Sequence, residues 1–564
     1  MTARLTDIRD DRVIRLPDIE SDDHGARSAL VGRRTVTYRE LADTVDRLAA
    51  RLRELGAAPG DRVVIWMAKG PEFAQAILAA LQAGCAYVPV DGGHPAARLD
   101  AILSDTEPIA LFTDARHLRL RTDPALPESV RSVVVVGEEH EVRPSIAHAR
   151  DAPLSDNRTA VPTVTWAEFL GTPHDDAPLS APPTDITPDG LAAILYTSGS
   201  TGAPKGVQIS HRNLMAFIDW ARRELAVGPD DVFANHASFN FDLSTFDLFV
   251  ALSVGAAVWI VEDGEARDIA ALAAGIREHR VTVWYSVPSI LMLLTASCAL
   301  TPEVIRSLRY VLFAGEVYPT PRLRELAAAL ADSVHPPVLY NLYGPTETNV
   351  CTFHRVTDTD LLTDDPVPIG LPVGNAELLI VDADGRRLET PDAVGELVVQ
   401  GDCVTPGYWR RDSEPAAEQH RHGRHPTGDL VALVDGRLVY RGRKDRMVKL
   451  SGYRIELGEI ESMVLRHLSI DAAAVVVLGT GAKARLALFY TVRAGAPEPT
   501  LIDIKEHCAR HLPRYMVPRT VTRMTALPRN GNGKIDYRSF AEVPPTLARR
   551  RSSARRDEPR RGLS

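Results

Sequence analysis

The stretch Leu195-Tyr-Thr-Ser-Gly-Ser-Thr-Gly-Ala-Pro-Lys-Gly206 is the strongest local signal in this chain of 564 residues. It follows an apolar run, 191–195, that predicts a buried strand, and it precedes a helix expected to begin near Ser210. Its glycines allow backbone N–H groups to close around an anion, and its hydroxyl side chains add further donors. Lys205 adds a positive charge suited to the β- and γ-phosphates of a nucleotide. The stretch therefore predicts a phosphate-binding loop.

The spacing of this loop differs from the GxxxxGK[ST] pattern of a Walker A motif, so a P-loop NTPase is not indicated. A flexible Ser/Gly linker is the plain alternative. A linker, however, does not lie between a buried strand and a helix and end in Pro-Lys-Gly. The residues expected to bind phosphate are Thr197, Ser198, Gly199, Ser200, Thr201, Gly202 and Lys205.

Outward from this loop, short Val- and Ile-rich runs alternate with helical stretches over the first four hundred residues, which is the pattern of α/β layers. The clearest unit is a strand over 62–67, followed by a helix over 72–82 that Pro71 opens and Gly84 ends. The region from about 140 to 190 is rich in Pro, Asp and Thr and predicts surface loops. Further strands are expected over 133–136, 257–261, 310–313 and 338–342.

The pattern changes after about Val373, where short strands near Asp-Gly turns predict a small antiparallel sheet. A compact α+β unit is expected from Arg443 onward. The segment 542–564 carries many Arg residues among Pro and Ser and too few apolar residues to fold alone, so a disordered tail is expected rather than a nucleic-acid-binding arm. The strands of the small sheet are expected over 377–381, 396–400 and 437–440, and the α+β unit is expected to hold helices over 456–467 and 501–512 and strands over 473–478 and 485–492.

Composition narrows the class of protein. Lys and Arg number 65 and Asp and Glu number 74, a net charge of −9 that argues against a general nucleic-acid binder. The five cysteines lie far apart without CxxC spacing, which favours a reducing compartment and no structural zinc. The longest apolar run, 248–261, is shorter than the ~20 residues of a membrane span and predicts buried core. With no signal-peptide pattern at the N-terminus, a soluble cytoplasmic protein is expected.

Several further motifs occur in a fixed order from Thr37 to Asp536. With the phosphate loop, they make the chain resemble the adenylate-forming (ANL) superfamily, and specifically the amino-acid adenylation enzymes of nonribosomal peptide synthesis. The matching stretches are Thr37-Tyr-Arg-Glu-Leu41, Ala83-Gly-Cys-Ala-Tyr-Val-Pro-Val-Asp91, Asn341-Leu-Tyr-Gly-Pro-Thr-Glu347, Gly395-Glu-Leu397, Thr427-Gly-Asp429, Gly442-Arg-Lys-Asp445, Leu512-Pro-Arg-Tyr-Met-Val-Pro518 and Asn532-Gly-Lys-Ile-Asp536.

The resemblance implies an α/β fold in two parts and a reaction in two halves. A large adenylation core over 1–442, with mixed sheets flanked by helices and a small β-barrel-like subdomain, would bind ATP and substrate. A small mobile α+β domain over 443–541 would carry the catalytic lysine, and the tail would span 542–564. A carboxylate attacks the α-phosphorus of ATP and releases pyrophosphate, and a pantetheine thiol then displaces AMP to form a thioester. Positioning and charge neutralisation supply most of the catalysis.

The resemblance also assigns roles to single residues. Lys534 would bridge the substrate carboxylate and a phosphate oxygen; without the other motifs it would be an ordinary turn lysine. Glu347 would bind Mg²⁺, and Asp429 would bind the ribose, although an Asp there could also cap a turn. His425 with Pro426 replaces the usual aromatic-basic pair, which questions one contact on the adenine side. The remaining assignments are Tyr343 and Asn341 for adenine, Gly344 and Thr346 for phosphate, Arg443 for ribose or phosphate, Lys444 and Asp445 for the hinge, and Gly452 for the pantetheine tunnel.

Asp242 is expected to select the kind of acid that is activated. A carboxylate in an apolar context is costly unless a positive group pairs with it, and in the family this group is the α-ammonium of an amino acid. The plain alternative is a helix N-cap. The other residues that the family places around the substrate are Leu243, Phe246, Tyr285, Leu312, Ala314, Leu342, Val350 and Cys351.

These lining residues leave no charged group for a polar side chain and favour a compact apolar amino acid. The pattern resembles stand-alone prolyl-adenylate ligases, which load L-proline onto a carrier protein for pyrrole formation in secondary metabolism. Other apolar amino acids remain open, since such pockets often discriminate only ~10–200-fold.

Nothing after Asn532–Asp536 resembles a carrier domain, so a separate peptidyl carrier protein bearing phosphopantetheine is the expected partner, with no nucleic acid and no membrane. An acyl- or aryl-CoA ligase of the same superfamily is the first alternative, because it would share the fold, the ATP site and Lys534. A non-catalytic nucleotide-binding regulator is the second.

Overall fold

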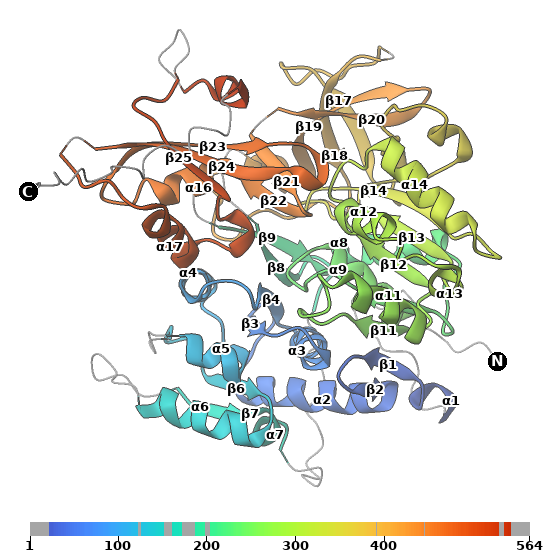
Figure 1. The fold of residues 1–564 in the computed structure, drawn as a ribbon. Coiled ribbons are helices and arrows are strands. Elements are labelled where there is room, and N and C mark those ends of the chain that lie inside the picture. The colour runs from blue at the N-terminus through green and yellow to red at the C-terminus, as the bar shows by residue number, and fades with distance from the viewer. Residues whose placement is uncertain are drawn as a thin grey trace, which may run out of the picture. The chain divides into compact units, whose positions relative to one another are not determined.

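The computed structural model describes residues 22–121, 126–151, 161–171, 186–197, 204–390, 392–414, 416–444, 446–493, 495–528 and 535–542. The chain divides into two compact units, one that ends at Glu456 and one that begins at Leu457 (Figure 1). Residues 447–456 therefore group with the first unit, and a domain boundary at Arg443 stays a proposal.

Two large sheets organise the described part of the first unit. The first has the order β16-β15-β14-β13-β12-β10-β11-β1-β2 and is parallel from β14 to β1, with antiparallel strands at both edges. Its strands are β1 (Ser28–Val31), β2 (Thr35–Thr37), β10 (Val232–Asn235), β11 (Ala257–Ile260), β12 (Val283–Ser286), β13 (Tyr310–Phe313), β14 (Val338–Tyr343), β15 (Thr352–Arg355) and β16 (Leu371–Pro372).

The second large sheet has the order β7-β6-β5-β3-β4-β8-β9 and is parallel except for the β8-β9 pair. Its strands are β3 (Arg62–Met67), β4 (Ala86–Asp91), β5 (Ala110–Asp114), β6 (Ser132–Val136), β7 (Thr163–Thr165), β8 (Leu191–Thr197) and β9 (Lys205–Ser210). The strands expected from Val- and Ile-rich runs are confirmed in both sheets.

The helices of the first unit connect and cover these sheets. They are α1 (Asp22–Gly25), α2 (Tyr38–Glu54), α3 (Pro71–Gln82), α4 (Ala96–Thr106), α5 (Ala115–Leu120), α6 (Glu139–Asp151), α7 (Trp166–Leu170), α8 (His211–Glu224), α9 (Leu243–Thr245), the π-helix η1 (Phe246–Val250), α10 (Ala251–Ser253), α11 (Ile269–Glu278), α12 (Pro288–Ala296), α13 (Pro302–Ile305), α14 (Thr320–Ala331), the 3₁₀ helix η2 (Asp358–Leu361) and α15 (Ala416–Arg421).

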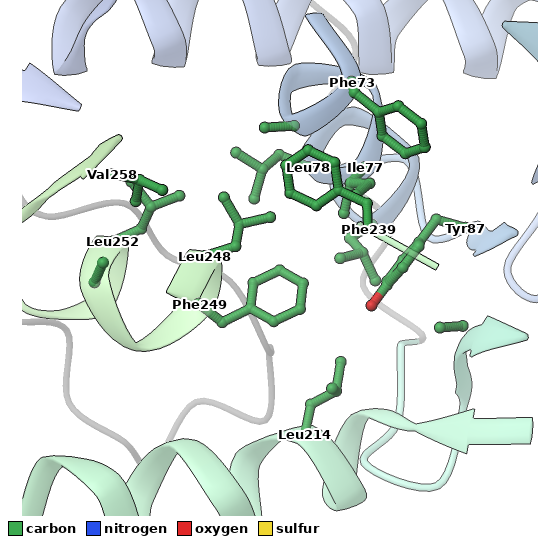
Figure 2. Packing of buried hydrophobic residues seen from close by; sticks show 14 of the residues in the cluster. Phe73, Ile77, Leu78, Tyr87, Leu214, Phe239, Leu248, Phe249, Leu252 and Val258 are labelled. Atoms are coloured by element: carbon green, nitrogen blue, oxygen red, sulfur yellow. The ribbon is translucent and has the colours of Figure 1, made fainter. Parts of the chain in front are cut away.

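Local sequence chemistry explains several helix boundaries. Thr37 and Glu40 form a reciprocal capping box that starts α2, and Pro71 occupies the first turn of α3 as expected. In the core, Figure 2 shows Phe73, Ile77 and Leu78 of α3 near Phe239 and the η1 side chains. The apolar run 248–261 forms η1, α10 and β11, and most of it is buried, which confirms its prediction as core.

One expectation was wrong. The region 140–190 was expected to be surface loops, but its described residues include most of α6, the strand β7 and the short helix α7. A capping box at Thr165 and Glu168 starts α7 despite the polar composition around it. The helix expected to begin near Ser210, after the predicted phosphate-binding stretch, is confirmed as α8. Strand β9, which pairs with β8 ahead of this helix, was not predicted.

The first unit also holds a four-stranded antiparallel sheet and a hairpin. The sheet has the order β17-β18-β19-β20, and the hairpin pairs β21 with β22. These strands are β17 (Glu377–Val381), β18 (Gly395–Gln400), β19 (Arg424–Val434), β20 (Arg437–Arg443), β21 (Met447–Leu450) and β22 (Tyr453–Glu456). The three predicted strands are β17, β18 and β20, and the antiparallel sheet is confirmed, but β19 was not predicted.

The second unit has the α+β content expected from its sequence. Its sheet has the order β23-β24-β25, with the first pair antiparallel and the second parallel. Among the helices of the described ranges, none combines the length and the apolar character that a membrane crossing requires. The elements are α16 (Leu457–Val464), β23 (Ile470–Leu478), η3 (Gly481–Lys483), β24 (Arg485–Val492), α17 (Leu501–His511), η4 (Arg514–Met516), β25 (Thr520–Arg523) and η5 (Tyr537–Glu542).

Candidate active site

The predicted phosphate-binding stretch connects β8 to β9. Thr197 ends β8 and is the register partner of Lys205, which begins β9. The Lys205 ammonium forms an ion pair of 2.8 Å with Glu414 and lies 5.2 Å from the centre of the Tyr408 ring. The residues between the two strands, Ser198, Gly199, Ser200, Thr201 and Gly202, lie outside the described residues, as do Asp445 and Lys534.

The carboxyl ends of the parallel strands bring the expected pocket residues together. Tyr285 of β12 is the register partner of Leu312 of β13, and Leu312 is the partner of Tyr340 of β14. Leu342 lies two residues beyond Tyr340 and therefore faces the same side of the sheet. One buried apolar cluster contains these pocket residues, namely Leu243, Phe246, Tyr285, Leu312, Ala314, Leu342 and Val350.

Cys351, the remaining residue expected to line the pocket, is also buried but packs in a different cluster with Tyr343, Cys403 and Leu397. Its role in the pocket stays a prediction.

Two aromatic residues shape this cluster. The rings of Phe246 and Tyr285 meet edge to face with their centres 5.3 Å apart. Tyr285 is 1% exposed, and its hydroxyl has no hydrogen-bond partner among the described residues. Burial, together with the nearby carboxyl groups of Asp242 and Asp247, raises the pKa of Tyr285 well above its ordinary value. The hydroxyl is therefore a neutral polar group on an otherwise apolar wall.

Asp242 lies between β10 and α9, close enough to Tyr285 for its charge to raise the pKa of that hydroxyl. It directly precedes α9 without a side-chain capping bond of the usual kind, although its carboxylate accepts from the backbone N–H of Leu243, the first residue of that helix. Burial raises the pKa of Asp242, against a hydrogen bond from Thr346 and the positive charge of Lys449. A carboxylate that burial disfavours in this way is suited to a cationic ligand group.

Residues after β14 form the second half of the candidate site. Gly344 can only be glycine, because a Cβ there would lie 1.6 Å from the Asn349 carbonyl oxygen. Asn341, expected to bind adenine, donates its side-chain N–H to the Pro368 carbonyl at 2.9 Å. Tyr343 is buried, and its hydroxyl donates to Asp429 at 2.6 Å.

Both carboxylate oxygens of Asp429 have partners. One accepts from the Tyr343 hydroxyl, and the other accepts from the Arg443 guanidinium at 2.8 Å. The Lys449 ammonium lies 5.6 Å from the centre of the Tyr343 ring. The structure thus brings the expected ribose ligand, Asp429, beside two other residues expected to contact the nucleotide. Lys444, expected at the hinge, is exposed and pairs with Glu396 at 2.9 Å.

Glu347, the expected metal ligand, is 1% exposed and is held by three residues from distant parts of the chain. Arg454 donates to one carboxylate oxygen at 2.6 Å and the Tyr408 hydroxyl donates to the other at 2.7 Å. The His425 ring lies 4.0 Å away and stacks on His420. Burial alone would raise the pKa of Glu347, but the charges of Arg454 and His425 and the two hydrogen bonds bring it well below its ordinary value. The side chain is therefore a carboxylate anion at neutral pH.

This arrangement predicts a large effect on stability. Glu347→Gln should lower the free energy of unfolding by about 3–5 kcal/mol, because it removes the carboxylate that pairs at 2.6 Å with the largely buried Arg454 guanidinium. Urea unfolding at pH 7 measures this loss. Glu347→Gln combined with Arg454→Met should recover most of it, and a double variant as unstable as the single one would contradict the explanation.

Gly452 lies in the turn between β21 and β22. Its φ is +79°, and a Cβ there would lie 2.5 Å from Val287, so this close approach requires glycine. Its backbone N–H donates to Glu316 at 2.7 Å.

Two parts of the chain match family models of known proteins. Residues 19–409 match the family model of AMP-binding enzymes, and residues 459–534 match that of the AMP-binding enzyme C-terminal domain. The chain belongs to the AMP-binding enzyme family. The family resemblance inferred from the motifs is thereby confirmed.

Individual relatives of this AMP-binding enzyme are similar over nearly their whole length. An L-proline--[L-prolyl-carrier protein] ligase of Streptomyces coelicolor is 57% identical over 96% of this chain and 99% of that protein. A ligase of the same description from Pseudomonas fluorescens is 40% identical over 90% of this chain and 94% of that protein. The solved Vibrio cholerae adenylation domain AlmE, in complex with glycyl-adenosine-5'-phosphate, is 25% identical with a TM-score of 0.74, covering 92% of this chain and 95% of that one.

Sequence reasoning missed several residues of this AMP-binding enzyme's candidate site. Tyr408 and Arg454 hold Glu347, and Lys449 lies near both Asp242 and Asp429. A partial signal existed, since Lys449 and Arg454 flank Gly452 in the stretch Lys449-Leu-Ser-Gly-Tyr-Arg454. The unusual His425 was also visible, but its neighbour Glu347 could not be inferred from the sequence.

Proposed function

We propose that this AMP-binding enzyme activates L-proline with ATP and transfers the prolyl group to a separate carrier protein. In the first half, the proline carboxylate attacks the α-phosphorus of ATP, which gives prolyl-AMP and pyrophosphate. In the second half, the phosphopantetheine thiol of the carrier protein attacks the acyl carbon and AMP leaves with the electron pair. The observation that carries the proposal is Asp242, a carboxylate disfavoured by burial at the edge of a compact apolar cluster.

Proline fits the chemistry of this pocket. Its secondary ammonium would pair with Asp242, which would offset the cost of burying that carboxylate. Its ring would contact Phe246, Leu312 and the other apolar lining residues. Thr346 donates to Asp242 and would keep the carboxylate oriented toward the incoming ammonium. The near-complete similarity to two ligases described as acting on L-proline supports the same substrate here.

The nucleotide would lie along the carboxyl end of β14 and the residues after it, beside the middle of β19. Asp429 would accept hydrogen bonds from the ribose hydroxyls, with Tyr343 and Arg443 holding its carboxylate in place. Tyr343 would stack on adenine beside Asn341, and Gly344 would allow the phosphates to approach the backbone. Thr197, Lys205 and the residues between them would surround the phosphates, and Thr346 would add a hydroxyl donor.

Glu347 fits a magnesium ion, because it is held as a carboxylate anion and Mg²⁺ uses one or two carboxylates together with substrate phosphates. Arg454 provides the positive charge at this carboxylate in the present structure. When bound, the ion would neutralise charge on the phosphates. Tyr408 would orient the second oxygen of Glu347.

In the second half-reaction, the carrier protein's pantetheine arm would pass close to Gly452. Lys444 and Asp445 would form the hinge between the two half-reactions. Lys534 would be the catalytic lysine of the first half-reaction. The carrier protein as partner agrees with the descriptions of both relatives. A cytoplasmic location stays a prediction.

The substrate proposal predicts the outcome of an ATP–pyrophosphate exchange assay with a panel of acids. L-Proline should exchange at least ~10-fold faster than other compact apolar amino acids. Cyclopentanecarboxylate has the ring of proline but no ammonium, and it should exchange at least ~100-fold more slowly because Asp242 would remain unpaired. Equal rates with benzoate, a fatty acid or cyclopentanecarboxylate would instead identify an acyl- or aryl-CoA ligase. No exchange with any acid would favour a non-catalytic regulator.

A further inference from the structure

A buried lysine lies outside the set of residues used above. Lys69 follows β3 and is 5% exposed. Its ammonium donates to the carbonyl oxygens of Asn235 at 2.6 Å and of His236 at 3.0 Å. These carbonyls lie at the carboxyl end of β10, in the other large sheet. Lys69 therefore ties the carboxyl end of β3, a central strand of one sheet, to the carboxyl end of β10 in the other.

The segment that Lys69 holds leads directly to Asp242. After His236 the chain passes through Phe239 and reaches Asp242 only six residues later. The Lys69 ammonium lies 5.7 Å from the centre of the Phe239 ring, and that ring stacks on Phe73 of α3 with centres 4.9 Å apart. Figure 2 shows Phe239 between α3 and the apolar side chains of η1. Contacts to Lys69 thus occur at both ends of the segment 235–239.

A second chain of contacts connects Lys69 to the far side of the pocket. Asn235 donates its side-chain N–H to Asp247 at 3.2 Å, and Asp247 belongs to η1 beside the pocket residue Phe246. Asn235 is also the register partner of Tyr285. The π-helix η1 is a rare element that frequently occurs at functional sites.

We propose that Lys69 is a positioning residue for amino-acid binding, which fixes the segment 235–241 so that Asp242 meets the substrate ammonium. The inference rests on the proposed function, because it assigns Asp242 that role. Lys69 itself touches neither substrate nor nucleotide in this assignment. It acts through the two carbonyl groups and the Phe239 ring.

The charges around Lys69 suit a fixed structural contact rather than a solvent-exposed one. The carboxyl groups facing it come from three elements: Asp247 of η1, Asp263 after β11 and Asp91 at the end of β4. Burial lowers the pKa of Lys69 to about 7, against the attraction of these groups. Burial likewise raises the pKa of Asp247 well above its ordinary value, against the hydrogen bond from Asn235 and the charge of Lys69.

The test measures the KM for proline and the KM for ATP separately. Both come from ATP–pyrophosphate exchange by the purified full-length Lys69→Met variant. Methionine keeps the length and apolar stem of lysine but cannot donate to the two carbonyls. The KM for proline should rise at least ~10-fold while the KM for ATP stays within about twofold, because a shift of about 1 Å in a positioned group costs up to ~100-fold. An unchanged KM for proline in the folded variant would overturn the proposal.

A double variant separates positioning from simple charge compensation. Lys69→Met combined with Asp247→Asn removes the buried carboxylate whose positive neighbour is lost, so its unfolding temperature should return toward that of the wild type. The KM for proline should stay raised, because the carbonyls of Asn235 and His236 still lack their donor. A KM that recovers together with the unfolding temperature would overturn the proposal. The double variant also serves if Lys69→Met alone does not fold.

Arg309→Met is the matched control. Arg309 also holds β10, but at its amino end, through Asp231 at 2.6 Å and the Ala226 carbonyl at 2.7 Å. This variant should lower the unfolding temperature without changing the KM for proline, and an equal rise in KM would overturn the proposal. The wild type separates the proposed substrate from the role of Lys69. If the wild type shows no exchange with proline, the proposed substrate is refuted. Lys69→Met is then measured with the amino acid that the panel identifies.

Discussion

Lys534→Ala should reduce ATP–pyrophosphate exchange by at least ~10²–10³-fold while leaving the fold intact. During adenylate formation two anions, the substrate carboxylate and the α-phosphate, must approach each other, and a cation between them removes much of the electrostatic cost. A long flexible ammonium can contact both groups at once, whereas alanine can contact neither. Exchange measured at saturating proline and ATP reports the loss directly, and thermal unfolding checks the fold.

Lys483→Ala is the control for this variant. Lys483 belongs to the same unit of the chain and is exposed in the short helix η3. Its removal should change exchange by less than about twofold, since an exposed lysine contributes little. Near-normal exchange by Lys534→Ala would refute its assignment as the catalytic lysine.

Asp242→Asn should lower kcat/KM for proline by about 10²–10³-fold, mainly through KM. The amide has the shape of the carboxylate but no charge, so the substrate ammonium would be buried without its partner, a loss of about 3–5 kcal/mol. The KM for ATP should change little, because the expected nucleotide ligands lie after β14 and on β19. Exchange assays that vary each substrate in turn measure both constants.

Asp242→Asn should lose activity but should not lose stability. Burial raises the pKa of Asp242, so at neutral pH the ligand-free protein holds a carboxylate that folding disfavours. A carboxyl group whose pKa is raised on folding destabilises the folded state as pH rises through that pKa. Asp242→Asn should therefore unfold at a temperature equal to or above that of the wild type at pH 8. A less stable variant with normal proline kinetics would show that Asp242 is a structural residue.

Elements whose signals are local could be predicted from the sequence. Strand β3 and helix α3 have the expected positions, because a continuous apolar run, Pro71 at the first turn and Gly84 beyond the end act within a few residues. Three strands of the small antiparallel sheet follow in the same way from its Asp-Gly turns, whereas β19 was not predicted. The region 140–190 was misread because its composition is loop-like, while a capping box and pairing with β6 produce α7 and β7.

The candidate site, like the fold, could be predicted from the sequence only where the signal is local. The kinds of residues at Asp242, Glu347 and Asp429 were visible in motifs, since each motif is a short stretch of chain. Their partners were not visible. Arg454 lies 107 residues from Glu347, and Tyr408 lies 61 residues from it. Hydrophobic periodicity carries no information on pairs at such distances.

The order of residues along this chain by itself determined the family, and it predicted the phosphate-binding stretch and the apolar residues around the substrate, because each depends on neighbours in the sequence. Only the tertiary structure decided which charges meet. Packing between separate sheets brings Lys69 to the end of β10, and packing of the β21-β22 hairpin brings Arg454 to Glu347. These contacts form when distant segments pack around one core, and the low polarity of that core gives the few buried charges their strong effect.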